Sequence, residues 1–303
     1  MQGRRSSHYY WGFTREERLP VDVSLKSYVR DQVRRNAERL SRPLRIARGY
    51  GEYQDRTRLA EAVSPSACYD IDTLQAQGYL RIEPPATLVS EVVQASRKKL
   101  ADVGSLPQSR NKAFFSQLLD SSDLGLGGPF MRFALDEKLL STTARYLGVA
   151  PFLESVELLY SKPVAGAPAQ SQQWHRDRTD RRIIKVFLYA VDVTPRQGPL
   201  SLLSRSDSAR VPEVLFHYVP DQQMARYVEP ERAIALTGPA GTTIMTDTQA
   251  CYHLGSRCQE PRLAYVAYYS SGFGYRPREG SWDVPTAGRA TLSRLQRLAL
   301  GSS

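Results

Sequence analysis

The chain has 303 residues, of which 41% are hydrophobic and 24% are charged. This is the composition of a globular protein with one large domain or two small ones. Its longest apolar run, from Leu263 to Tyr269, is too short for a transmembrane helix. The three cysteines show no CxxC spacing, which predicts reduced thiols in a cytoplasmic protein rather than a disulfide or zinc framework.

The net charge of +10 is concentrated near the N-terminus. Residues 1–60 hold 14 Lys or Arg and 7 Asp or Glu, a net +7. Such a region can attract nucleic acid, acidic lipid or an anionic substrate, or it can be a solvated helical arm. Because no nucleic-acid-binding motif accompanies it, we expect the arm, and neither nucleic acid nor a membrane as partner.

The first predicted element is an amphipathic helix in this basic region. Apolar residues from Val23 to Leu40 recur close to helical spacing, and Pro43 follows. Since the residue before a proline is biased away from helical geometry, the helix is expected to end before Pro43. We expect its apolar stripe to pack on the main domain.

Short helices and one strand come next along the chain. The pattern predicts a helix over 71–78 ended by Gly78, a strand over 79–82, and helices over 87–102 and 136–147, the last capped by Gly148. These segments precede a change of texture near residue 151.

Beyond residue 151, β-branched and aromatic runs recur between turn residues, which predicts a sandwich or barrel. Helices followed by a β core indicate an α+β fold. We divide the chain into a basic N-terminal helical extension, 1–68, and a main domain, 69–303. The predicted strands are 152–161, 183–191, 200–204, 232–237, 241–246 and 262–270.

The most informative stretch is Gln173-Trp174-His175-Arg176-Asp177. On an extended chain, residues two apart share a face, so His175 and Asp177 would lie together and could provide two ligands to a metal. The same pair on a surface strand would simply hydrogen-bond, and an HxD pattern is common by chance.

A second histidine and an arginine extend this pattern. His253 follows the strand-like run 241–247, and Arg262 opens the next strand. Two histidines and one carboxylate leave three positions open on Fe(II), enough for a bidentate 2-oxo acid and for O2. The planar guanidinium of an arginine suits the far carboxylate of such an acid.

Four segments together resemble the phytanoyl-CoA dioxygenase-like family of Fe(II)/2-oxoglutarate-dependent oxygenases, over residues 69–275. They read QQWHRD, KVFLYAVDVTPRQGPL, GTTIMTDTQACYHLGSR and RLAYVAYY. The resemblance implies a double-stranded β-helix, a jelly-roll or cupin-like barrel, with packed helices. It implies that His175, Asp177 and His253 hold iron and that Arg262 binds 2-oxoglutarate.

The chain departs from the family pattern at two places. Ser204–Asp207 stands where members often have a Pro-Gly-Ser-His turn, and the spacing from His253 to Arg262 is slightly short. Arg257 is therefore an alternative partner for the 2-oxoglutarate carboxylate. Ser256 is a further candidate for contact with the cosubstrate, and Lys185 is either another or a solvated strand end.

The carboxylate of Asp177 bears on the reaction, because related halogenases have a small residue at this position. Its presence predicts O2-dependent hydroxylation of a C–H bond in a small metabolite, with desaturation or ring formation as alternatives that use the same ligands.

Basic residues next to the HxD segment bear on the substrate. Three arginines follow that segment: Arg178, Arg181 and Arg182. They could form a rim that attracts an anionic or carrier-linked substrate. Alternatively, they belong to a solvated turn in which Asp180 is their partner. Two other functions stay open: a zinc enzyme using the same three ligands, and a non-catalytic barrel that binds an anionic ligand or partner through its basic surface.

Overall fold

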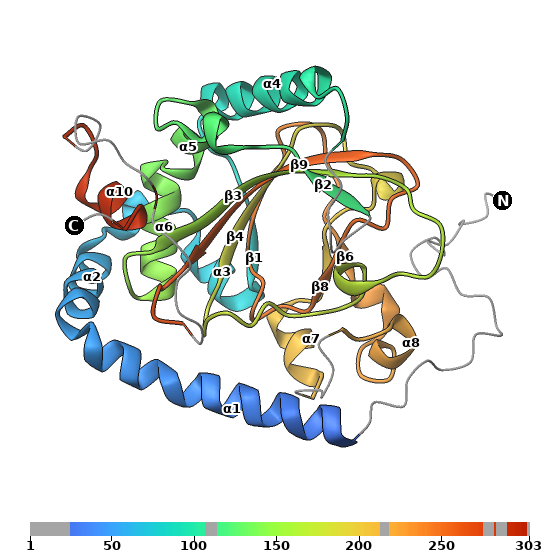
Figure 1. Ribbon diagram of the computed structural model, residues 1–303, viewed down its shortest axis with the longest axis horizontal. Helices are drawn as coiled ribbons and strands as arrows, with labels where there is room; N and C mark the ends of the chain where they lie inside the picture. The colour runs from blue at the N-terminus through green and yellow to red at the C-terminus, as the bar shows by residue number, and fades with distance from the viewer. Residues whose placement is uncertain (1–24, 107–113, 213–217, 275–281, 283–289, 302–303) are drawn as a thin grey trace.

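The computed structural model describes residues 25–106, 114–212, 218–274, 282 and 290–301. Two sheets form the centre of the molecule, and helices surround them (Figure 1). The helices are α1 (Leu25–Arg48), α2 (Tyr50–Ala62), α3 (Ile71–Gln77), α4 (Ala86–Asp102), α5 (Pro129–Ala134), α6 (Glu137–Leu147), α7 (Arg205–Arg210), α8 (Asp221–Met224) and α10 (Arg294–Ala299). The strands are β1 (Tyr79–Ile82), β2 (Phe115–Gln117), β3 (Phe152–Ser161), β4 (Ile184–Tyr189), β5 (Ser201–Leu202), β6 (Ile234–Ala235), β7 (Thr243–Asp247), β8 (His253–Leu254) and β9 (Arg262–Ser270).

The larger sheet has six antiparallel strands in the order β1-β7-β4-β9-β3-β2, and the smaller has the order β6-β5-β8. Strands far apart in sequence are neighbours, as in a jelly roll. The predicted α+β fold with a double-stranded β-helix is confirmed.

Helices cover the outer face of the larger sheet. Val186 of β4 and Ala267 of β9 belong to one buried cluster with side chains of α5 and α6. Two tyrosines of β9 fix the helices by hydrogen bonds, because the hydroxyl of Tyr265 donates to the Phe130 carbonyl (2.8 Å) and that of Tyr269 to the Ala134 carbonyl (2.7 Å). The outer face therefore belongs to the buried core between sheet and helices.

The inner face of the same sheet is opposed by the smaller sheet. Tyr189, Ile244 and Ala264 pack there against Leu202 and Leu236. Because side chains alternate along a strand, every second residue of β4 and β9 faces this inner space, and that is where functional side chains gather.

The predicted elements from residue 71 onward correspond closely to the observed ones. Helix α3 ends at Gly78, whose φ of +79° is left-handed, and α6 ends at Gly148 in the same way. All six predicted strand runs contain an observed strand, although β5 and β6 each have only two residues.

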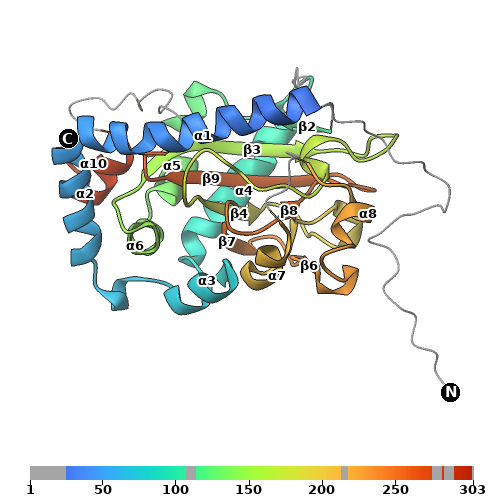
Figure 2. The same cartoon turned by 90° about the horizontal axis from the view of Figure 1, so that it is seen from below.

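Two expectations about the first helix are wrong. Helix α1 continues through Pro43 to Arg48, and it extends along the outside of the molecule (Figure 1, Figure 2). Pro43 is itself exposed, so water can bind the backbone carbonyl that the proline leaves without a donor. The side chains of Val33 and Leu40 are 63% and 73% exposed. These two described members of the stripe do not pack on the main domain.

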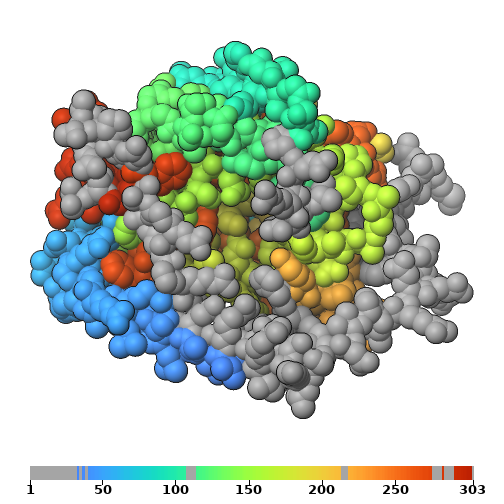
Figure 3. All heavy atoms as spheres, viewed as in Figure 1, coloured from blue at the N-terminus to red at the C-terminus, as the bar shows by residue number. Residues whose placement is uncertain are grey.

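Helix α2 does pack against the rest of the chain. Arg56, 1% exposed, donates to the carbonyls of Ala150 (3.2 Å) and Leu298 (2.9 Å), and its guanidinium lies 3.4 Å from the ring centroid of Phe152. In the space-filling view, α2 and the segment around α10 lie together at one end of the molecule (Figure 3). The boundary predicted at residue 68 stays a prediction. Among the described residues, no helix is both long and apolar enough to cross a lipid bilayer.

Candidate metal centre

The two histidines predicted as metal ligands lie directly opposite each other on neighbouring extended segments. The backbone N–H of His175 donates to the His253 carbonyl (3.0 Å), and that of His253 donates back to the His175 carbonyl (2.9 Å). This is the hydrogen-bonded pair of an antiparallel ladder. Their ring centroids lie 4.2 Å apart, so both imidazoles project to one side.

Asp177 joins them as the extended chain predicts. Its backbone N–H donates to the Thr248 carbonyl (3.0 Å), which ties the end of the HxD segment to the turn after β7. One carboxylate oxygen, Oδ2, lies 3.9 Å from Nε2 of His253. One ligand atom from each of His175, Asp177 and His253 falls within 4.8 Å of the others.

Both imidazoles are held in the tautomer that a metal needs. Nδ1 of His175 is 2.9 Å from the Gln173 carbonyl, and Nδ1 of His253 is 3.1 Å from the Cys251 carbonyl. Since a carbonyl only accepts, each Nδ1 carries the hydrogen and each Nε2 keeps its lone pair. Such outer hydrogen bonds orient metal-binding histidines.

Burial keeps the three groups in their ligand forms. Burial first, and then the neighbouring His253, lowers the pKa of His175 to about 3. Burial likewise lowers the pKa of His253. Burial disfavours the charged form of Asp177, but Lys185 and the two histidines outweigh that effect, so its pKa is lowered. At neutral pH the site has two neutral imidazoles and a carboxylate, as metal binding requires.

Lys185 of β4 is the cation closest to this site. Its Nζ lies 2.7 Å from Oδ2 of Asp177, and Oδ2 has no partner with full hydrogen-bond geometry. The contact is therefore an ion pair that leaves a lone pair of the carboxylate unused. Lys185, predicted as a cosubstrate contact or a solvated strand end, lies in the structure against the carboxylate of Asp177, one of the three candidate metal ligands.

Sequence reasoning missed a buried network beneath the site. Asp247, fully buried, accepts the hydroxyl of Tyr146 (2.7 Å) and the backbone N–H groups of Gln249 and Ala250 (both 2.9 Å). The guanidinium of Arg205 lies 3.6 Å from it. Asp247 thus shapes the turn whose Thr248 carbonyl holds Asp177. Its contacts with Gln249 and Ala250 are those of a local turn, but its partners from α6 and α7 are far away in the sequence, so no local signal could identify the network.

The structure separates the two candidate arginines. The guanidinium of Arg257 makes a two-pronged ion pair with Asp221 (2.6 and 2.9 Å). That of Arg262 is 7% exposed, donates to the Gly198 carbonyl and to the Ser256 hydroxyl (2.9 Å), and makes no ion pair with a carboxylate of the described residues. Its Nε has no hydrogen-bond partner. A buried cation of this kind requires an anion.

Tight backbone packing places Arg262 and Ser256 together. Gly198 has a φ of +59°, and a Cβ there would meet the backbone of Arg257 at 2.6 Å, so only glycine fits. Ser256 itself has a φ of +60°, and its hydroxyl lies 3.0 Å from that of Ser161.

The three predicted rim arginines differ in their surroundings. Arg182 is exposed and donates to the Tyr146 carbonyl (2.6 Å), which binds it to α6. Arg181 is exposed and Arg178 is half-buried. Asp180 makes no ion pair with a guanidinium of the described residues. It accepts the backbone N–H groups of Arg181 (2.6 Å) and Ser271 (2.8 Å).

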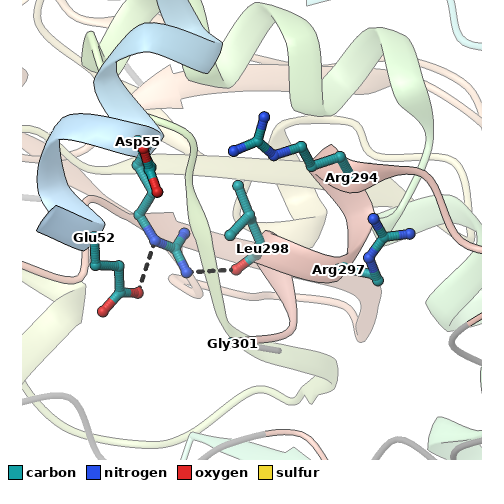
Figure 4. A pocket seen from close by; sticks show the side chains of 7 residues that line it. Glu52, Asp55, Arg294, Arg297, Leu298 and Gly301 are labelled. Carbon is teal, nitrogen blue, oxygen red and sulfur yellow. Dashed lines mark hydrogen bonds and ion pairs between the residues drawn. The ribbon is translucent and has the colours of Figure 1, made fainter. Parts of the chain in front are cut away.

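A pocket of about 480 Å³ lies elsewhere on the molecule, between α2 and α10. Figure 4 shows Glu52 and Asp55 opposite Arg294, Arg297 and Leu298 in this pocket. Arg56 also lines it and donates to the Glu52 carboxylate (2.9 Å) and to the Leu298 carbonyl (2.9 Å). None of the predicted site residues lines it. Its lining holds no histidine, so this pocket does not offer the donor set of the metal centre.

The donor set fits a divalent transition metal. Two imidazoles and one carboxylate on one side of a site, with the remaining directions open, are the facial arrangement used by non-haem iron. The carboxylate of Asp177, which here pairs with Lys185, and the two free Nε2 lone pairs would bind it.

Comparisons with known proteins show similarity at the level of fold. No protein-family model matches the chain, and no curated protein matches it. The solved structure of EctD from S. alaskensis with 2-oxoglutarate and 5-hydroxyectoine is 20% identical, covers 77% of this chain and 89% of that one, and has a TM-score of 0.51. HygX from Streptomyces hygroscopicus, with nickel and 2-oxoglutarate bound, is 15% identical over 75% of this chain and 93% of that one, with a TM-score of 0.51.

Proposed function

We propose that this protein is a non-haem Fe(II)- and 2-oxoglutarate-dependent oxygenase. The observation that carries the proposal is the joint presence, in one barrel, of a facial His-Asp-His triad and a buried arginine that pairs with no carboxylate in the described part of the chain. The fold similarity to EctD and HygX, both solved with 2-oxoglutarate, supports it. The phytanoyl-CoA dioxygenase-like subfamily is part of this proposal and rests on the sequence motifs.

His175, Asp177 and His253 would hold the iron, and Arg262 would bind the distal carboxylate of 2-oxoglutarate. Iron supplies the activation of O2 and the oxidation of a substrate C–H bond. The hydroxyl of Ser256 fixes the guanidinium of Arg262, and the Gln173 and Cys251 carbonyls fix the two imidazoles. This preorganisation positions the cosubstrate before O2 arrives.

A zinc hydrolase would use the same triad but has no role for Arg262. Zinc needs no second cosubstrate, whereas the buried guanidinium requires an anion. We therefore prefer the oxygenase, with a small-molecule substrate that it hydroxylates. Arg178 and Arg181 remain candidates for a rim that attracts an anionic substrate, while Arg182 is already bound to α6.

The test is anaerobic spectroscopy of the purified protein. We expect Fe(II) and 2-oxoglutarate together to produce the weak visible charge-transfer band of a chelated oxo acid, and His253→Ala to abolish it. Gln173→Ala is a matched control, since only the carbonyl of Gln173 contacts His175. Fe(II) binding without the band in the wild type would refute the cosubstrate assignment and favour other metal chemistry.

A further inference from the structure

The inner face of the larger sheet carries a second carboxylate near the metal centre. Val266 of β9 pairs with Glu157 of β3 and with Phe187 of β4. Phe187 packs with the cluster between the two sheets. Because directly paired residues share a face, Glu157 faces the same inner space as the metal centre.

Lys185 lies one row further along this face. It pairs with Tyr268, two residues after Val266, so Lys185 and Glu157 are two strands and one row apart. Two strand spacings across the sheet (about 10 Å) and one row along it (about 7 Å) place their Cα atoms about 12 Å apart. A lysine and a glutamate side chain together span that distance.

Glu157 has little else to bind. It is half-buried, and its one hydrogen bond comes from the hydroxyl of Ser155 at 3.4 Å. It makes no ion pair with any residue in the described part of the chain, yet it acts electrostatically on Lys185. A carboxylate facing a protein interior is costly without a cation. Two carboxylates, those of Asp177 and Glu157, thus share a single cation, Lys185.

When a divalent metal binds, Glu157 rather than Asp177 becomes the carboxylate without a positive partner, and Lys185 can supply one. Lys185 contacts Oδ2 of Asp177, the oxygen that also lies nearest to His253. A metal bound there neutralises Asp177 and repels the ammonium group. Lysine has a flexible stem and a compact charge, so it can change partners without moving the backbone.

We propose that, in the metal-free protein, the ammonium group of Lys185 pairs with Asp177 in place of the metal ion. When a divalent metal binds, this ammonium group moves to Glu157. Glu157 is then a positioning residue that acts on the metal through Lys185. The inference rests on the metal-binding role proposed for the triad, but not on the cosubstrate or the substrate. It replaces the cosubstrate contact that the sequence suggested for Lys185.

The experiment is a double-mutant cycle read as the affinity for Ni²⁺ alone, measured by competition with a chelator at pH 7.5. Glu157→Gln is expected to weaken Ni²⁺ binding about tenfold, and Lys185→Met to strengthen it by a similar factor. In the Lys185→Met background, Glu157→Gln should change the affinity less than twofold. Glu154→Gln is the matched control, because Glu154 lies on the same strand but binds Ser270.

Three results would overturn the proposal. If Glu157→Gln left the Ni²⁺ affinity unchanged, Glu157 would have no part in metal binding. Equal losses in both backgrounds would mean that Glu157 attracts the metal directly. Weaker binding in Lys185→Met would mean that Lys185 holds Asp177 in place for the metal. If the Lys185→Met variant does not fold, the double-mutant cycle is measured with Lys185→Gln in its place. The 2-oxoglutarate band of the wild type tests the proposed function separately.

Discussion

The guanidinium of Arg262 donates a 2.9 Å hydrogen bond to the hydroxyl of Ser256, a residue held at a φ of +60°. Non-glycine residues rarely adopt this conformation. Such strained backbone is found where the surrounding structure fixes it, often at functional sites. Here it lies between the second histidine and the buried arginine, and it turns the Ser256 hydroxyl toward both Arg262 and Ser161.

The first prediction concerns this residue. Ser256→Gly should weaken 2-oxoglutarate binding several-fold, because Arg262 loses the hydroxyl that orients it. Its thermal stability should change little, since glycine relieves the backbone strain while the side-chain hydrogen bonds are lost. Titration of the anaerobic Fe(II) protein with 2-oxoglutarate gives the affinity, and thermal unfolding gives the stability. An unchanged affinity would separate Ser256 from the cosubstrate site.

The second prediction distinguishes the two arginines. Arg262→Gln should weaken 2-oxoglutarate binding at least about 30-fold, because a charge-assisted pair with a buried carboxylate is lost. Arg257→Gln should leave that affinity within about threefold and lower the stability instead, since it leaves Asp221 unpaired. The same titration applies to both variants. If Arg257→Gln had the larger effect on affinity, Arg257 would be the carboxylate partner.

The third prediction concerns the buried network below the metal centre. Asp247→Ala should lower the free energy of unfolding by about 3–5 kcal/mol, because it leaves the Tyr146 hydroxyl, two backbone N–H groups and the charge of Arg205 without their acceptor. Tyr146→Phe removes the hydroxyl that donates to Asp247 and accepts from Arg205, and the loss of these two hydrogen bonds should cost only about 2 kcal/mol. Urea unfolding of both variants measures the two losses in the free energy of unfolding. Equal losses would mean that the network does not centre on Asp247.

The fourth prediction is the pH dependence of the metal-free protein. His175 has a pKa of about 3 when folded, against an ordinary value of 6.5. Between these values the unfolded chain binds more protons, so stability falls as pH falls. From pH 7.5 to pH 5, this residue alone should remove about 2 kcal/mol of stability, and His253, whose pKa is also lowered, acts in the same direction.

The measurement is urea unfolding with a chelator present, at both pH values. The His175→Gln variant controls for all other titrating groups and should lose about 2 kcal/mol less than the wild type over the same interval. Identical pH dependence in the two proteins would show that His175 is not held neutral by burial.

Much of the fold was predictable because its signals are local. Gly78 and Gly148 end helices where the chain needs a left-handed residue, and strands β3, β4 and β9 follow from dense β-branched and aromatic runs. Pro43 misled the prediction for α1, since an exposed helix tolerates a proline whose lost hydrogen bond water replaces. The exposed Val33 and Leu40 show that an amphipathic pattern does not by itself name a packing partner.

The amino-acid sequence by itself determined most strands of the barrel, although not β2 or β8. It also placed His175 and Asp177 on one face, because a two-residue spacing on an extended chain is a property of local geometry. It also supplied His253 and Arg262 as candidates. Only the tertiary structure decided that the two histidines form a ladder pair. It also showed that Arg257 is already paired with Asp221, whereas Arg262 is not. Finally, it placed Lys185 and Glu157 on the same inner face of the sheet. These relations depend on strand register and burial, which join segments far apart in the chain and which no local pattern specifies.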